Sequence, residues 1–203
     1  MFKKTLFVFA LLLTSVVAGF SLSGKNSSLS RQAELHCSSA LRGTLEKIEK
    51  LPQVRELIGE VLEEGPLYLK VNHERSAQFE GYWSTEDRTI SITQKGNTTQ
   101  AGMITTLLFE LHNAHRDKDF RQLDHQAELG EINKRDYVKG IEYIEYENVL
   151  AVSTLLDEGI EKGYFPEASA WHPHKRFEDH FRFQKKMGHS GWIAKNYDML
   201  MAT

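Results

Sequence analysis

The sequence predicts a mainly α-helical α+β fold, in which a small antiparallel β-sheet packs beside a buried central helix. Three observations support this fold class. Apolar residues recur at helical spacing over most of the chain, and most extensively from 134 to 162. Alternating residues and turn signals gather only between Leu67 and Thr93. Directly after this β-rich part, an aliphatic stretch from 103 to 111 predicts a helix that lies deep in the core.

The first 23 residues are typical of a secretory signal. Lys3 and Lys4 precede an apolar run from Leu6 to Phe20 with small residues near its end. An uncleaved anchor is the alternative, because the run approaches the ~18 residues of a spanning helix. We expect an exported protein, periplasmic, envelope-associated or secreted, with no membrane span after cleavage. The expected organisation is a signal peptide at 1–23, a flexible spacer at 24–30 and one helical domain at 31–203.

Charge and cysteine content exclude several classes of function. Removing Lys3 and Lys4 from the 25 basic residues leaves 23 against 28 acidic ones, a net charge near −5. This balance argues against nucleic acid or an anionic membrane as a partner. Cys37 is the only cysteine, so the chain has no internal disulfide. The fold must therefore depend on its apolar core.

Two helices are expected before the sheet. Ser30 can cap the first helix, and Pro52 suits the first turn of the second, which ends at Gly65 and Pro66. The apolar stripe of the first helix comprises Leu35, Leu41, Leu45 and Ile48.

The sheet and the cap of the central helix follow. Alternation predicts strands at 67–71, 79–83 and 88–93. A turn from Ser84 to Asp87 separates the last two strands, and Thr98 or Thr99 caps the next helix.

The central helix carries a polar face opposite its aliphatic stripe. Residues three and four apart lie together on a helix surface. That face comprises Thr106, Phe109, Glu110, Asn113 and Asp117. The carboxyl group of Glu110 is therefore expected beside the core.

Residues 109 to 114, Phe-Glu-Leu-His-Asn-Ala, resemble the active helix of the zincin metallopeptidases, usually written HELxHA. In that motif two histidines bind zinc and the glutamate is the general base. Phe109 and Asn113 stand at the two ligand positions, and Glu110 at that of the base. The resemblance implies a zincin-like fold, in which an edge strand lines the substrate cleft. Because Phe cannot bind metal and Asn is a poor zinc ligand, we expect no cofactor, with zinc as the alternative.

The segment after the central helix divides into two parts. Residues 117 to 130 are expected to be a polar connection with a helical turn or two, and 134 to 162 the longest helix. One row of that helix comprises Val138, Glu142, Glu145, Val149, Val152 and Leu156. Its two acids point where core residues should lie, and a buried charge needs a partner, a proton or a metal.

These acids complete the candidate site. In zincins with a glutamate ligand, that ligand comes from a helix downstream of the active helix, and the resemblance places Glu142 or Glu145 similarly. We name Glu110 as the candidate catalytic residue. The expected pocket comprises Thr106, Phe109, Asn113, Glu142 and Glu145. The alternative is ordinary architecture, in which Arg, His or Tyr neutralises the acids.

Histidines and basic residues gather between Trp171 and His189. Their spacing matches no zinc motif. A weaker alternative metal site combines Glu142 and Glu145 with His172 and His174. A basic, aromatic surface that packs or binds an acidic partner is the preferred interpretation.

Three functions follow from these features. The first is an exported, zincin-like protein that has lost catalysis and binds a protein partner or a peptide-like ligand, as an effector or envelope-associated factor. The second is a hydrolase that uses Glu110 with Glu142 or Glu145, either with a metal or as a carboxylate pair acting on a cell-wall polymer. The third is a structural helical domain. We expect binding rather than catalysis.

Overall fold

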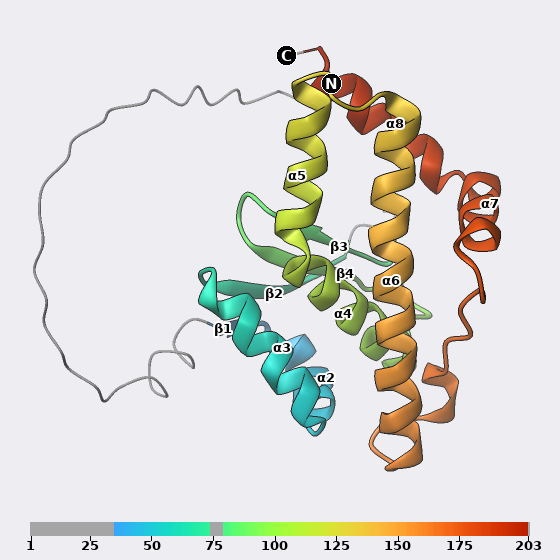
Figure 1. The fold of residues 1–203 in the computed structure, drawn as a ribbon. Helices are drawn as coiled ribbons and strands as arrows, with labels where there is room; N and C mark the ends of the chain where they lie inside the picture. The colour runs from blue at the N-terminus through green and yellow to red at the C-terminus, as the bar shows by residue number, and fades with distance from the viewer. Residues whose placement is uncertain (1–34, 74–78, 203) are drawn as a thin grey trace, which may run out of the picture.

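A computed structural model describes residues 35–73 and 79–202 (Figure 1). The expected signal peptide and spacer lie outside the described residues. The strands are β1 (Leu35–Cys37), β2 (Leu67–Asn72), β3 (Gly81–Ser84) and β4 (Thr89–Thr93). The helices are α2 (Ser39–Ile48), α3 (Pro52–Glu63), α4 (Gln100–His115), α5 (Asp117–Glu128), α6 (Lys134–Glu161), the 3-10 turn η1 (Glu167–Ser169), α7 (Phe177–Met187) and α8 (His189–Leu200). None of these helices is long and apolar enough to cross a membrane.

The fold class is confirmed as mainly helical α+β, but the sheet is mixed rather than antiparallel. Its strand order is β1-β2-β4-β3, and β1, β2 and β4 run parallel to one another. Only the β3–β4 pair is antiparallel. In this strand order β3 lies at one edge of the sheet and β1 at the other. Alternation of side chains identifies strands and their faces, but it does not determine their direction of pairing.

The first expected helix begins later than predicted. Leu35 to Cys37 form β1, which pairs in register with β2, Leu35 opposite Leu67. α2 then starts at Ser39. The apolar side chain of Leu35 packs against the core from a strand, so an apolar stripe alone did not locate the start of the helix.

The remaining helix boundaries agree with their caps, with one exception. Pro52 starts α3, and the Thr99 hydroxyl accepts a hydrogen bond from the Gly102 amide at the start of α4. The expected polar connection at 117–130 is instead the continuous helix α5. Its few apolar residues, including Leu123, pack against a second apolar cluster that contains residues of α6 and α8.

α4 packs against β3 and β4, and α2, α3, α5 and α6 pack against α4. α6 is the longest helix and contacts α4, α5, α7 and α8 (Figure 1). The main core is built from α2, α3, the sheet, α4 and the C-terminal half of α6. The second cluster joins the N-terminal half of α6 to α5 and α8. Glu110, Asn113 and Glu145 line a cavity to which residues of both clusters contribute.

A close backbone approach brings β3 onto α4. A Cβ atom on Gly81 would lie 2.5 Å from Cγ2 of Thr106 and 3.3 Å from Cγ of Glu110. A larger residue at Gly81 would force the Thr106 side chain or the backbone to shift, since real Cβ contacts are longer than 3.0 Å. The edge strand therefore lies directly against the turn of α4 that carries Glu110.

Candidate functional site

α4 supplies a buried carboxyl group held by neutral donors. Glu110 is only 5% exposed to solvent. Its Oε2 accepts a hydrogen bond of 2.9 Å from Nδ2 of Asn113, and the backbone of Trp83 in β3 donates another. Burial raises the pKa of Glu110 to about 7, although these two hydrogen bonds oppose the rise. Glu110 is therefore poised to gain or lose a proton near neutral pH.

Both polar atoms of the Asn113 side chain form hydrogen bonds with neighbouring residues. Its amide nitrogen donates to Glu110, and its Oδ1 accepts a 2.9 Å hydrogen bond from Nδ2 of the buried Asn148 on α6. The side chain at the second zincin ligand position therefore links α4 to α6. At the first position, the Phe109 ring packs against the Trp171 ring, with centroids 5.6 Å apart.

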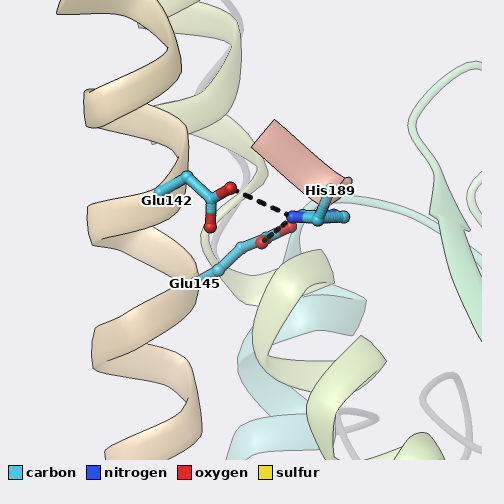
Figure 2. Close-up of side chains that lie close together, drawn as sticks. All are labelled: Glu142, Glu145 and His189. Carbon is cyan, nitrogen blue, oxygen red and sulfur yellow. Dashed lines mark hydrogen bonds and ion pairs between the residues drawn. The ribbon is translucent and has the colours of Figure 1, made fainter. Parts of the chain in front are cut away.

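α6 supplies two more acids, as its inward row predicted. Glu142 is 0% exposed, and the side chain of Glu145 is 14% exposed. Both carboxylates point at the ring of His189 at the start of α8 (Figure 2). Its Nδ1 lies 3.3 Å from Oε1 of Glu142 and 3.4 Å from Oε2 of Glu145. Ser190 adds a hydrogen bond of 2.6 Å from its hydroxyl to Oε1 of Glu142.

The electrostatics of this group follow from burial and mutual repulsion. The pKa of Glu145 is raised to about 8, chiefly by burial. The charge of His189 opposes this rise, and the charges of Glu142 and Glu110 add to it. Burial alone would lower the pKa of His189, but the hydrogen bond to Glu142 and the charges of the three acids raise it overall. The protonation of Glu110, Glu145 and His189 is thus linked, because the charge of each group affects the others.

Two buried polar atoms next to these groups have no hydrogen-bond partner among the described residues. They are Oε2 of Glu142 and Nε2 of His180 on α7, and 3.9 Å separates them. His180 is 5% exposed, and burial lowers its pKa. An unpaired buried polar atom is destabilising and needs an explanation in a folded protein.

A cavity of about 340 Å³ opens onto three of the titrating groups, namely Glu110, Glu145 and His189. The edge strand β3 lines one side of this cavity through residues 81 to 83. Aromatic side chains form much of its wall: Phe79, Tyr82, Trp83, Phe109, Phe120, Tyr137, Trp171 and Trp192. The cavity therefore combines polar reactive groups with apolar walls, as ligand sites generally do.

The structure brings together most, but not all, of the residues expected in the pocket. Phe109, Asn113 and Glu145 line the cavity beside Glu110. Glu142 does not line the cavity but reaches His189, whereas Thr106 faces Gly81 and lines a different, smaller cavity.

The histidine that meets the two glutamates is neither of those named in the weaker metal site. His172 and His174 are exposed, and His189 takes that place. Glu142, Glu145 and His189 each offer one donor atom within 4.8 Å of the others, a group able to hold a metal ion. The sequence carried no spacing signal for His189, because it lies 47 positions beyond Glu142 and meets it only through the packing of α8 on α6.

Comparison with known proteins gives no assignment: no family model, curated protein or solved structure matches this chain.

Proposed function

We propose that this chain is an exported hydrolase of zincin-like architecture, which holds an extended, peptide-like substrate in the aromatic cavity and uses Glu110 as its general base. The observation that carries the proposal is the position of Glu110. Its buried carboxyl group lies on the central helix, opens into a cavity and shares that cavity with Glu145 and His189. A structural core would contain apolar residues at these positions, because buried acids are destabilising.

The edge strand supports an extended substrate. One side of β3 pairs with β4, where the Glu80 carbonyl accepts a hydrogen bond of 2.7 Å from the Thr93 amide. The backbone of Trp83 donates to Glu110 instead, so alternate groups of β3 face the acid and the cavity. An extended chain can add to such an edge through main-chain hydrogen bonds, while aromatic walls accommodate its side chains.

The proposed reaction is the attack of water on an amide carbonyl. Glu110 takes a proton from the water as its oxygen bonds to the carbonyl carbon, and the C–N bond then breaks as that proton passes to the leaving nitrogen. A general base is most effective when its pKa lies near the working pH, and the pKa of Glu110, about 7, meets this condition. The hydrogen bonds from the Asn113 side chain and the Trp83 backbone hold the carboxyl group of Glu110 in place.

A second candidate function is binding of the same kind of ligand without cleavage. It is favoured by the two zincin ligand positions, since Phe109 packs on Trp171 and Asn113 is engaged by Glu110 and Asn148. Neither side chain is available to a metal on α4. This candidate gives no role to the buried carboxyl group of Glu110 that opens into the cavity, and for that reason we place it second.

Peptide cleavage by the purified protein tests the proposal. Wild type and Glu110→Gln are incubated with a diverse mixture of unstructured peptides, and the products are identified by mass spectrometry. The matched control is Glu147→Gln, on α6 but outside the cavity, where Glu147 pairs with Arg116. We expect new termini with wild type and the control, and none with Glu110→Gln. Peptides that wild type and Glu110→Gln both bind, but that neither cleaves, would establish the second candidate function.

Export is tested separately by cell fractionation and by N-terminal sequencing of the mature protein. We expect the protein outside the cytoplasm, with an N-terminus shortly after the apolar run that ends at Phe20. A full-length chain in the cytoplasm would contradict this part of the proposal.

A further inference from the structure

The distances around His189 are those of metal ligands rather than of good hydrogen bonds. Nδ1 of His189 lies 3.3 Å and 3.4 Å from the nearest carboxylate oxygens of Glu142 and Glu145. A charge-assisted N–H···O bond is usually ~2.7–2.9 Å long. Ligand atoms bound at about 2.1 Å around one tetrahedral ion are roughly 3.4 Å apart. Nδ1 of His189 is therefore spaced from both carboxylates as ligands of one cation are, and all three donor atoms lie within 4.8 Å of one another.

The charge of the group also calls for a cation. Glu110, Glu142 and Glu145 place three carboxyl groups at or beside one cavity. In the described part of the chain, no lysine or arginine forms an ion pair with any of them, and only histidines do so. When the three carboxyl groups are ionised, one imidazolium leaves a net negative charge, which a divalent ion can balance.

The unpaired atoms supply a second, independent indication. Oε2 of Glu142 and Nε2 of His180 are both buried, have no hydrogen-bond partner among the described residues and lie 3.9 Å apart, too far for a hydrogen bond. His180 reaches this place from α7, on a different element from the other ligands. A buried imidazole nitrogen and a buried carboxylate oxygen left without hydrogen bonds, beside Glu145 and His189, are donor atoms that a bound cation would satisfy.

We propose that Glu142, Glu145 and His189, with His180 as a fourth donor, bind one divalent transition-metal cation. Two carboxylates with two imidazoles suit Zn²⁺, Mn²⁺ or Fe²⁺ better than Ca²⁺ or Mg²⁺, which prefer oxygen ligands alone. Ser190 supports the shell from outside, because its hydroxyl donates to Glu142 and so orients the carboxylate. This centre lies on α6, α7 and α8 and does not use the α4 positions of the zincin motif.

The evidence for the cation site does not depend on catalysis. Only the role of the bound ion in polarising a substrate carbonyl rests on the proposed function. Glu145 and His189 line the same cavity as Glu110, so an ion bound to them would face the proposed substrate. It would polarise the carbonyl group that water attacks. The two inferences can therefore fail separately: metal binding without hydrolysis refutes the proposed function, and hydrolysis that withstands chelation refutes the role of the metal.

Titration of the mature protein with Zn²⁺ tests the site. The protein is treated with EDTA, the chelator is removed, and ZnCl₂ is added in a calorimeter. A parallel titration with Co²⁺ is followed by visible absorption, which reports the ligand geometry. The variants are Glu145→Gln, His189→Gln and His180→Gln. The controls are Glu147→Gln and His125→Gln, which alter an acid and a histidine of ion pairs outside the cavity.

We expect one Zn²⁺ per wild-type chain. Because even supporting groups change metal affinity by ~10–100-fold, Glu145→Gln and His189→Gln should weaken binding by at least about 100-fold, and His180→Gln by about tenfold. The controls should stay within about twofold, since their side chains lie outside the site. Absence of stoichiometric binding by wild type would overturn the proposal, as would unchanged affinity in Glu145→Gln. Circular dichroism checks that each variant folds, and Glu145→Gln alone decides if His189→Gln does not fold.

Discussion

Replacing Glu110 by glutamine isolates the free energy that the buried carboxylate costs the fold. The pKa of Glu110 is raised from 4.5 to about 7, so the folded state binds this proton more tightly than the unfolded chain does. Stability from this group is therefore full below about pH 4.5, falls as the pH rises towards 7 and stays reduced above it. At about 1.4 kcal/mol per pKa unit, the loss amounts to roughly 3 kcal/mol.

Glutamine keeps the shape of the side chain and cannot ionise. It can still accept a hydrogen bond from Asn113 or from the Trp83 backbone. We therefore expect Glu110→Gln to be about 2–3 kcal/mol more stable than wild type at pH 8.5, and within about 1 kcal/mol of it at pH 4.5. Urea unfolding in EDTA, followed by circular dichroism at both pH values, measures the difference. Glu147→Gln should change stability by less than about 0.5 kcal/mol at either pH.

A loss of stability in Glu110→Gln at pH 8.5, in place of the expected gain, would refute this reasoning. If Glu110→Gln is less stable than wild type at pH 8.5, the hydrogen bonds to the carboxylate outweigh its desolvation, and Glu110 is a structural link between α4 and β3. A variant that is more stable but cleaves no peptide would instead show the trade between stability and activity that is typical of catalytic acids.

Two further predictions concern the framework of the site. Asn148→Ala removes the donor to Oδ1 of Asn113, so we expect a loss of about 1–3 kcal/mol in chemical unfolding, and an unchanged stability would show that water replaces the donor. Gly159→Ala would place a Cβ atom 2.1 Å from the Phe165 ring, so we expect destabilisation by about 1–3 kcal/mol in thermal melts. The control Gly191→Ala meets nothing within 4 Å inside a helix and should stabilise the protein by about 0.5–1 kcal/mol; similar effects at both glycines would contradict the packing described for Phe165.

Periodicity predicted the helices whose apolar faces are continuous. α3 begins at Pro52 and α6 spans almost the predicted residues, because proline and long stripes are local signals. α5 was missed because few of its residues are apolar, and its stability depends on α6. The parallel pairing of β2 with β4 was also missed, since strand direction depends on which edges meet in the folded chain.

The candidate site was predicted only where its residues share one helix face. Glu110 and Asn113 on α4, and Glu142 and Glu145 on α6, follow from spacing alone. His189 could not be found in this way. Its position depends on Gly188, whose φ of 90° turns the chain between α7 and α8. Only the packing of α8 on α6 then brings the histidine to the acids.

The position of His189 and Ser190 at the start of α8 has a consequence for the packing of that helix. Glu142 and Glu145 meet α8 through these two side chains, so the contact between α6 and α8 covers the acids. A buried carboxylate is destabilising unless a proton, a partner or a cation neutralises it. The packing of α8 on α6 is therefore expected to be more sensitive to pH and to metal ions than the apolar core around α4, and hydrogen exchange along α8 with and without Zn²⁺ would measure this.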